Sequence, residues 1–355
     1  MAKKSKSHPI LLQERPWANN ENKVWLASSI NLYRNFEKFK FPIKLDSDRK
    51  HQMISLASNH LLKTKLLSHP ELIPVEEMSP TEKEFLVEHF LSPQSFHQAH
   101  SGEGFILDDT GEFLASLNIQ NHIHFELIDT RGDLESSWNR IVTIETELGK
   151  TIPYTFSPKF GFMTSNPRQC GTGFLLTVFL QPSALIHTGK IDEVIERLTT
   201  NDIALTGLQG DPNKIIGDIF AVHNRRMLGV TEENIISIIR IFTTKLLVEE
   251  NGARSALRKE ENPEVMDKVS RAYAVLMHSY QMETIEALDA ISLLKLGVDL
   301  GWIEGITIAE LNHLFFNCRR GHLLSRYENE LVSEEIPHKR SEFIHDSLKK
   351  LKLKI

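Results

Sequence analysis

The chain has little cysteine and no long apolar run, and these two absences exclude several classes of protein. Only Cys170 and Cys318 occur among the 355 residues, in no CxxC pair, so we expect a reduced protein without a structural zinc site. No apolar stretch approaches the roughly 20 residues of a membrane span. The lysine-rich start lacks the apolar segment of a signal peptide. We therefore expect a cytoplasmic protein with no membrane partner.

The chain also has no excess of positive charge. Its formal net charge is −6, which argues against a general nucleic-acid-binding protein. Hydrophobic residues make up 41% and charged residues 25% of a sequence without repeats or low-complexity blocks. This composition is typical of a globular protein, and 355 residues are enough for two or more hydrophobic cores.

Hydrophobic periodicity divides the chain into two parts. Up to Gly229, segments with alternating apolar residues mix with helical segments, whereas from Thr231 onward apolar residues recur every three or four positions. Asn262 and Pro263 form a strong helix start, a capping side chain followed by proline at the first helical position. We therefore expect an α+β domain followed by an all-helical domain. The expected division is a flexible N-terminal arm over 1–22, the α+β domain over 23–257 and the helical domain over 258–355.

One segment, over 116–127, reads SLNIQNHIHFEL. Its alternating apolar residues predict one strand, with an apolar face and an opposite face that carries hydrogen-bonding side chains. Those side chains are Asn118, Gln120, His122, His124 and Glu126. A metal site, a catalytic wall or an ordinary polar strand face would each give this pattern.

The two histidines of this segment would lie about 7 Å apart along one strand face. A zinc or iron site is conceivable at that spacing, but it needs further ligands, and the sequence contains no second cluster. A polar strand that lines a cleft is the commoner outcome. We predict no metal, and we keep a metal-binding HxH protein as an alternative.

Two glycine-containing loops are further candidates. NPRQCGTGF, over 166–174, enters an apolar strand, and backbone amides in such a turn can meet a phosphate. It matches neither GxGxxG nor GxxxxGK[ST], so the motif alone names no function. Cys170 is expected to be a buried, inert thiol, because no base can be assigned to it. TGLQGDPNK, over 206–214, predicts a mobile lid or a simple turn.

Four segments, in the same order along the chain, resemble motifs of the bacterial protein-arginine kinases, ATP:guanido phosphotransferases of the guanidino (phosphagen) kinase superfamily. LASSINLYRN (26–35) is similar to the family's LSSRIRLARN, and NIQNHIHF (118–125) to NEEDHIRI. TSNPRQCGTGFLLT (164–177) is similar to TSCPTNLGTGLRAS, and TGLQGDP with GDIFAVHNR (within 206–229) to RGIYGEG with GNIFQISNQ. The likeness covers about residues 23–345. It implies an antiparallel sheet flanked by helices, followed by an all-helical C-terminal domain.

The resemblance assigns three catalytic positions, and two of them are substituted. Gln120 stands where the family has its base, the second glutamate of NEED, and Asn166 stands at the active-site cysteine. Asp211 matches the loop glutamate and is the one carboxylate that remains. Because a glutamine amide has no basic form near neutral pH, we expect proton abstraction to be lost.

The positions that bind nucleotide and phosphoarginine in the family are substituted as well. The arginines that hold the ATP triphosphate are matched here by Ser29, Asn31, His124, Leu175 and Thr206. Arg34 matches another family arginine, one that does not hold the phosphates. The phosphoarginine-binding RDxxRA motif is replaced by IPHKRS, with Ile336, Pro337, Lys339 and Arg340.

These substitutions lead to the hypothesis of a pseudokinase, a protein-arginine kinase homologue that acts as a scaffold or adaptor. The resemblance implies a stress-response or Clp-type protein quality-control pathway, with a zinc-containing kinase-activator protein and a Clp-type unfoldase as partners. No cofactor is expected on this hypothesis. The family dimerises through its helical domain, and an apolar surface for a homodimer is expected from Leu311, Leu314, Phe315, Leu323 and Leu324.

An active protein-arginine kinase with a rebuilt site is the alternative, with ATP and Mg²⁺ as cofactors. Its site would use His122, His124, Asp211 and Lys214. On this alternative, a protonated His124 would replace one of the missing arginines.

Overall fold

The computed structural model describes residues 14–93, 96, 99–260, 262–327 and 331–354. The chain divides into two compact units. Unit 1 consists mainly of Ser28–Thr177 and Asn224–Ser237, and unit 2 of Trp17–Ala27, Val178–His223 and Ile238–Ile355. Within the described ranges, no helix is long and apolar enough to cross a membrane.

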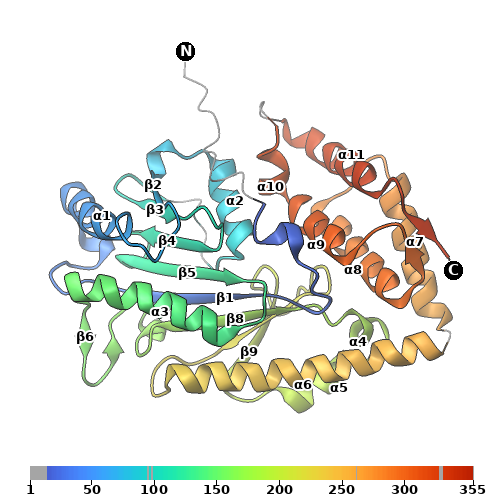
Figure 1. Ribbon diagram of the computed structural model, residues 1–355, viewed down its shortest axis with the longest axis horizontal. Helices are drawn as coiled ribbons and strands as arrows, with labels where there is room; N and C mark the ends of the chain where they lie inside the picture. The colour runs from blue at the N-terminus through green and yellow to red at the C-terminus, as the bar shows by residue number, and fades with distance from the viewer. Residues whose placement is uncertain (1–13, 94–95, 97–98, 261, 328–330, 355) are drawn as a thin grey trace. The chain divides into compact units, whose positions relative to one another are not determined.

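The largest sheet has eight strands in the order β2-β3-β4-β5-β1-β8-β10-β9 (Figure 1). The strands are β1 (Trp25–Arg34), β2 (Glu71–Pro74), β3 (Gly104–Leu107), β4 (Phe113–Leu117), β5 (Ile123–Asp129), β8 (Phe174–Leu180), β9 (Ile203–Gly207) and β10 (Phe220–Asn224). The consecutive pairs from β2 to β1 are antiparallel. This agrees with the antiparallel sheet that the resemblance implied.

Two short antiparallel sheets accompany the large one. The first pairs β6 (Phe156–Ser157) with β7 (Gly161–Phe162). The second pairs β11 (Ile303–Glu304) with β12 (Lys352–Leu353). The second pair lies in the C-terminal part of the chain, which is otherwise helical as predicted, and only these two short strands were not expected. Two-residue strands are too short to show a period in the sequence.

Several helices begin at capping side chains that the sequence supplies. Asp46 accepts the N–H of Arg49 at the start of the first helix, and Asn262 accepts that of Val265, as its capping role predicted. Unit 1 contains α1 (Ser47–Leu61), α2 (Pro80–Phe90) and α3 (Leu134–Thr151). Unit 2 contains α4 (Ser183–His187), α5 (Ile191–Leu198), α7 (Pro263–His278), α8 (Thr284–Leu300), α9 (Ile308–Asn317), α10 (Arg320–Leu324) and α11 (Ile336–Leu348). Helix α6 (Glu232–Lys259) has residues in both units.

Strand β5 lies in the core of unit 1. All of its residues are buried, because α3 and α2 both pack against it. Its apolar side chains, such as Phe125, join a core that includes Leu114 of β4 and Ile141 of α3. Its polar side chains are therefore inside the unit and need partners there.

The single strand expected over 116–127 is wrong, because its middle forms a turn. Strand β4 ends at Leu117, β5 begins at Ile123, and these two residues pair across the hairpin. Asn118 has a φ of 60°, a conformation that asparagine adopts more readily than most residues. Its N–H donates to the carbonyl of His122 (3.1 Å) and closes the turn.

The five polar side chains of this segment consequently do not share one face. Gln120 is exposed in the turn, whereas His124 and Glu126 are buried on β5. The alternation is interrupted at Asn121, where a continuous strand would carry an apolar residue. A polar turn and a polar strand face look alike over a few residues, and this interruption was the signal that distinguished them.

Residues 17–22, part of the expected N-terminal arm, pack inside unit 2. Trp17 is 1% exposed, and its ring stacks on Phe316 of α9 with centroids 3.6 Å apart. Asn312 of α9 donates to the carbonyls of Asn20 (2.7 Å) and Asn22 (2.9 Å). The expected flexible arm is therefore wrong for this stretch, because a tryptophan supplies enough apolar area to anchor it. Residues 1–13 of the arm lie outside the described residues.

The apolar surface predicted for dimerisation is also wrong. Four of the side chains, Leu311, Leu314, Phe315 and Leu323, are at most 3% exposed within the single chain, and Leu324 is half-buried. An amphipathic helix buries its apolar face either inside a domain or against another copy, and its sequence looks the same in both cases. The homodimer itself stays a prediction.

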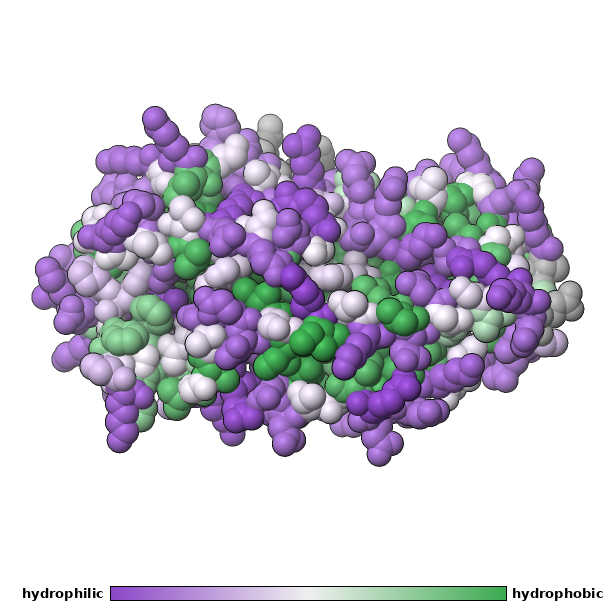
Figure 2. Space-filling view, turned by 60° about the horizontal axis from the view of Figure 1, so that its bottom comes forward, coloured by the Kyte–Doolittle hydropathy of each residue, from purple (hydrophilic) through white to green (hydrophobic). Residues whose placement is uncertain are grey.

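Figure 2 shows the face that lies at the bottom of Figure 1, with apolar side chains in separate patches among polar ones. Helix α6 runs along this edge in Figure 1, and two of its apolar residues, Ile241 and Val248, are 52% and 66% exposed. Isolated apolar residues of this kind are common on protein surfaces.

Candidate active site

Three of the positions that the resemblance assigns to nucleotide binding are joined by hydrogen bonds in unit 1. Ser29 and Asn31 lie on β1 and His124 on the neighbouring β5, and all three are at most 2% exposed. The Asn31 amide donates through Nδ2 to Ser29 Oγ (2.9 Å) and accepts through Oδ1 from His124 Nε2 (2.8 Å). Ser29 Oγ donates in turn to Oε1 of Glu126 (3.2 Å). We call this group the buried polar chain.

His124 carries no positive charge within the buried polar chain at neutral pH. Its Nε2 is the protonated nitrogen, because an amide oxygen only accepts, so Nδ1 faces Ser116 Oγ (3.4 Å) as the acceptor. Burial lowers the pKa of His124 to about 3. Tyr33 stacks on the ring with centroids 4.5 Å apart. A protonated His124 therefore does not supply a cation that would replace a family arginine.

Glu126 is neutral as well at pH 7. Burial raises the pKa of its carboxyl group to about 8, against hydrogen bonds from Ser92 and Ser29, which lower it. A carboxyl group held in its protonated form neither attracts a cation nor repels an anion. The buried polar chain is thus uncharged along its whole length.

The other two nucleotide positions also lack a cationic side chain. Leu175, on β8 of unit 1, accepts a long hydrogen bond from Asn31 Nδ2 at its backbone carbonyl (3.4 Å). Thr206, on β9 of unit 2, is half-buried.

Gln120 and Asn166 lie on two exposed loops that the structure brings together. Ser165 Oγ donates to the carbonyl of Gln120 (2.6 Å), and its N–H donates to Asn121 Oδ1 (2.8 Å). The Asn166 side chain accepts the N–H of Arg168 (3.1 Å) and caps a 3₁₀ turn. Neither Gln120 nor Asn166 can accept a proton from a substrate near neutral pH, and neither can serve as a nucleophile in place of a thiol.

His122 has a structural role beside these loops. Its Nδ1 accepts the N–H of Phe36 (2.9 Å), and its Nε2 donates to the carbonyl of Lys40 (2.8 Å). Burial lowers the pKa of His122 to about 4, although the bond to Lys40 raises it. Both ring nitrogens are used, so His122 has no free lone pair for a metal. Among the described residues, no three His, Cys, Asp or Glu side chains are placed to hold a metal ion.

Arg34, which the resemblance matches to a family arginine, is buried in unit 1. Its Nε pairs with Glu145 Oε1 (2.6 Å), and its NH1 donates to the carbonyls of Tyr33 (2.9 Å) and Thr172 (3.0 Å). Gly173 must be glycine here, because its φ is 58° and a Cβ would lie 2.7 Å from Arg34 NH1. The guanidinium group is therefore used within the unit and is not free for a phosphate.

Cys170 lies in the same glycine-containing loop and is 8% exposed, which confirms the expectation of a buried thiol. Its Sγ is 3.5 Å from Thr164 Oγ1. No base contacts it among the residues that the structure describes.

Asp211 and Lys214 are exposed on a tight loop of unit 2. The N–H of Gly207 donates to the carbonyl of Asp211 (2.8 Å), and the Asp211 carboxylate accepts the N–H of Asn213 (2.9 Å). Backbone hydrogen bonds close this loop. Of the two alternatives that the sequence left open for residues 206–214, a simple turn therefore fits better than a mobile lid.

The positions assigned to phosphoarginine binding lie in the first two turns of α11: Ile336, Pro337, Lys339 and Arg340. Arg340 is 1% exposed, and its guanidinium group donates to the carbonyls of Cys318 (2.9 Å) and Met282 (2.7 Å). Lys339 instead pairs with Glu342 at the surface (2.7 Å). Arg340 thus holds backbone segments of unit 2 together, and Lys339 is the accessible cation of the four.

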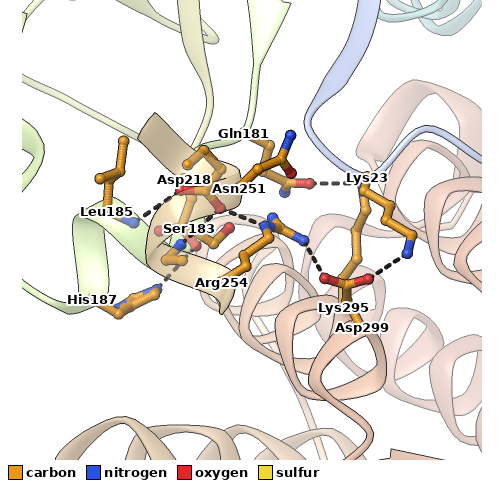
Figure 3. A network of polar contacts seen from close by, with 12 residues as sticks. Lys23, Gln181, Ser183, Leu185, His187, Asp218, Asn251, Arg254, Lys295 and Asp299 are labelled. Carbon is orange, nitrogen blue, oxygen red and sulfur yellow. Dashed lines mark hydrogen bonds and ion pairs between the residues drawn. The ribbon is translucent and has the colours of Figure 1, made fainter. Parts of the chain in front are cut away.

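A second polar cluster, which no motif in the sequence predicted, lies in unit 2 (Figure 3). Glu250 of α6 is fully buried and accepts the N–H groups of Ala184 (3.0 Å) and Leu185 (2.9 Å) in α4. It also accepts from Arg254 Nε (2.6 Å), and Arg254 donates through NH1 to Asp299 of α8 (3.0 Å). The cluster ties α4, α6 and α8 together.

Lys295 of α8 lies within this cluster and is 3% exposed. Its Nζ donates to Gln181 Oε1 (2.8 Å). Burial and then the charge of Arg254 lower the pKa of Lys295 well below its usual value, while Asp299 raises it. A lysine among the apolar residues of ISLLKLGV was the signal in the sequence for a buried polar partner.

Two surface hollows of unit 1 lie apart from all these positions. One, of about 800 Å³, is lined by the loop over 62–71 and by Arg140. The other, of about 430 Å³, shares part of that loop and adds Thr143 and Glu147 of α3. None of the residues that line them is a family site position.

Comparisons with known proteins identify the family. Residues 52–253 match the ATP:guanido phosphotransferase C-terminal catalytic domain, and residues 262–354 match the protein-arginine kinase McsB C-terminal domain. A protein-arginine kinase of Chlamydia pneumoniae is 33% identical over 349 residues, 96% of this chain and 96% of that one. The chain belongs to the protein-arginine kinase family. Another family member, from Halothermothrix orenii, is 29% identical over 329 residues, 92% of this chain and 94% of that one.

Solved structures of guanidino kinases share the fold. Lombricine kinase superposes with a TM-score of 0.57 at 16% identity, over 69% of this chain and 71% of that one. The duplicated taurocyamine kinase of Schistosoma mansoni gives a TM-score of 0.56 at 20% identity, over 64% of this chain. The match spans only 33% of that duplicated chain. At these identities the likeness establishes the fold alone.

ATP is the cofactor that the family's name implies, and the unit 1 residues do not fit its triphosphate. A phosphate site needs cations or N–H donors that are free to turn toward the ligand. Ser29, Asn31 and His124 are buried, uncharged and hydrogen-bonded to one another instead.

Proposed function

We propose that this protein-arginine kinase family member is a pseudokinase that acts as a scaffold or adaptor. The observation that carries the proposal is the buried polar chain. Three of its members, Ser29, Asn31 and His124, stand at positions that the resemblance assigns to nucleotide binding. Each of them donates or accepts a hydrogen bond within the buried polar chain rather than toward a ligand. The exposed amides of Gln120 and Asn166 support the same conclusion.

The energetics favour loss of nucleotide binding over a modest weakening. Hydrogen bonds to charged groups contribute roughly 1.5–3 kcal/mol each, so five arginines represent about 7–15 kcal/mol of gross interaction. Micromolar ATP affinity corresponds to only about 8 kcal/mol. The missing base adds a further loss of about 10²- to 10⁴-fold in rate. Restoring a single group is therefore insufficient for activity.

The proposal extends to the partners that the family resemblance suggests. A zinc-containing kinase-activator protein, a Clp-type unfoldase and a second copy of the chain would be retained as contacts in a protein quality-control or stress-response pathway. Light scattering at micromolar concentration tests the homodimer, and a monomer would remove it from the proposal.

An active kinase with a rebuilt site is the second candidate, supported by one observation. Asp211 and Lys214 are both exposed on one loop, and within the described part of the chain neither side chain has an ion pair. On this candidate they would act with ATP and Mg²⁺. His122 and His124, the other members of the rebuilt site, are already used by internal hydrogen bonds.

Phosphoarginine detection by mass spectrometry on an arginine-rich protein separates the two candidates. We expect no signal from the wild type or from Gln120→Glu, because a restored base still lacks a held triphosphate. A robust wild-type signal that Asp211→Ala or Lys214→Ala abolishes would establish the active kinase and overturn the pseudokinase proposal.

A further inference from the structure

The larger of the two surface hollows in unit 1 has a volume of about 800 Å³ and is lined by one loop and one helix residue. The loop spans 62–71, between α1 and β2, and the helix residue is Arg140 of α3. Small-molecule sites have volumes of roughly 300–1,000 Å³. We call this feature the loop hollow, and a ligand there would lie apart from every family site position.

The turn between β3 and β4 holds both the loop and the helix residue. Asp109 in this turn donates its backbone N–H to the carbonyl of Ser68 in the loop (2.9 Å). Asp108 and Glu112 in the same turn accept hydrogen bonds from Arg140, through NH2 (3.2 Å) and NH1 respectively. The loop and the guanidinium group are therefore both anchored to this turn before any ligand binds.

The backbone of the loop is strained at His69, which lines the loop hollow. Its φ is 45°, and Pro70 follows it. A positive φ is uncommon for residues other than glycine, and a residue before proline favours the extended region. Backbone in such sparsely populated conformations is found at ligand clamps and active sites. The strain at His69 is thus a second indication, besides the volume, that this loop has a binding role.

Two exposed lysines, Lys63 and Lys65, belong to a stretch without acids. Residues 49–70 contain no Asp or Glu, whereas the whole chain carries a net charge of −6. Lys65 lines the loop hollow and Lys63 the smaller hollow beside it, and within the described part of the chain neither has an ion pair. Arg140 is already paired with two carboxylates, and the acid that lines the smaller hollow is paired with a lysine of α3. Glu71 is then the acid that remains against two lysines, and an excess of one positive charge suits a singly charged anion rather than a polyphosphate.

Hydroxyl and apolar side chains complete the lining. Thr64 Oγ1 accepts the N–H of Leu66 (3.3 Å), which leaves its O–H as a donor, and Ser68 adds an exposed hydroxyl. Leu62 and Leu66 are 37% and 39% exposed. A carboxylate accepts hydrogen bonds from O–H and N–H donors, and a hydrocarbon group gains free energy by covering exposed leucines. The lining therefore suits a molecule that carries both groups.

We propose that the loop hollow binds a small organic monocarboxylate with an apolar body. The carboxylate would pair with Lys65 and accept hydrogen bonds from Arg140 and the two hydroxyls. The apolar body would cover Leu62 and Leu66. This carboxylate site goes beyond the proposed function, because it uses no family position and involves no phosphate transfer.

Calorimetric titration of the full chain with phenylacetate tests the carboxylate site, with two matched probes. Phenylacetamide has nearly the same shape without the charge, and acetate has the charge without the ring. We expect saturable binding of phenylacetate. Either matched probe should bind at least about tenfold more weakly, because each lacks one of the two kinds of contact.

Substitutions at exposed positions locate the binding. Lys65→Met should weaken phenylacetate binding at least about tenfold, whereas Lys65→Arg should retain it because the positive charge remains. The matched control is Lys190→Met, at an exposed lysine outside the loop hollow. Leu66→Ser should also weaken binding, while Leu228→Ser, at a leucine that is 48% exposed outside the loop hollow, should not.

Three results would overturn the carboxylate site: absence of phenylacetate binding, equal binding of phenylacetamide, or equal losses in Lys65→Met and Lys190→Met. Because these titrations contain no nucleotide, such a result leaves the pseudokinase proposal unaffected. Kinase activity, in turn, would overturn that proposal without affecting the carboxylate site.

Discussion

Glu126→Gln should remove a pH dependence of stability that the wild type has. The carboxyl group of Glu126 is fully buried, and burial raises its pKa from an ordinary value of 4.5 to about 8. The folded state therefore keeps a proton that the unfolded state loses between these two values. Stability from this group is complete below pH 4.5 and is lost as the pH rises toward 8. A glutamine at this position is neutral at every pH.

The size of the effect follows from the difference between the folded and unfolded pKa values of Glu126. A pKa difference of one corresponds to about 1.4 kcal/mol, so the wild type should lose about 3 kcal/mol relative to Glu126→Gln between pH 5 and pH 8. His122 and His124 act in the opposite direction, because their pKa values are lowered to about 4 and about 3. Their contribution is lost as the pH falls below 6.5, and it cancels when the variant is compared with the wild type.

Urea unfolding, followed by tryptophan fluorescence and circular dichroism at constant ionic strength, measures this difference. Glu233→Gln, at an exposed position of α6, is the control and should show no pH-dependent difference. If the difference between the wild type and Glu126→Gln were the same at pH 5 and pH 8, Glu126 would not be a buried, protonated carboxyl group. The conclusion that the buried polar chain is uncharged would then be refuted.

Three further changes test the internal roles of other family positions by the same unfolding assay. Arg34→Met should destabilise by about 3–5 kcal/mol, because Glu145 is left buried without its partner, while Arg34→Met/Glu145→Met should recover much of that loss; equal losses would contradict a buried pair. Gly173→Ala should cost at least about 1 kcal/mol, because of its positive φ and the approach of Arg34; wild-type stability would contradict that geometry. Arg340→Met should cost about 2 kcal/mol or more through its two carbonyl acceptors, whereas Lys339→Ala, at a half-buried position whose partner is the surface Glu342, should change little, and a reversed order would place Arg340 at the surface.

The architecture was predictable because long elements give clear periodic signals. The fold class followed from the alternation before Gly229 and the three-to-four spacing after Thr231, and the start of α7 followed from Asn262. The short strands β11 and β12 gave no such signal. The turn after Leu117 was missed because the alternation breaks at a single residue, Asn121, and resumes at Ile123.

The candidate site was predictable in its chemistry but not in its geometry. The residues at the positions that the resemblance assigns to nucleotide binding could be read from the sequence, and none of the five is an arginine. The burial of these side chains could not be read from the sequence. Burial lowers the pKa of His124 and raises that of Glu126, so both side chains are neutral at pH 7. The same limit explains why Leu311 and Phe315 were wrongly assigned to a dimer surface. The apolar side chains of a helix have the same spacing in the sequence whether they pack in a core or in an interface.

Calorimetric titration of the wild type with Mg-ATP tests the central claim most directly. We predict no saturable heat up to about 1 mM nucleotide, because affinity weaker than that corresponds to less than about 4 kcal/mol of binding. Binding in the micromolar range, abolished by Lys214→Ala, would contradict the claim that this chain has lost its nucleotide site.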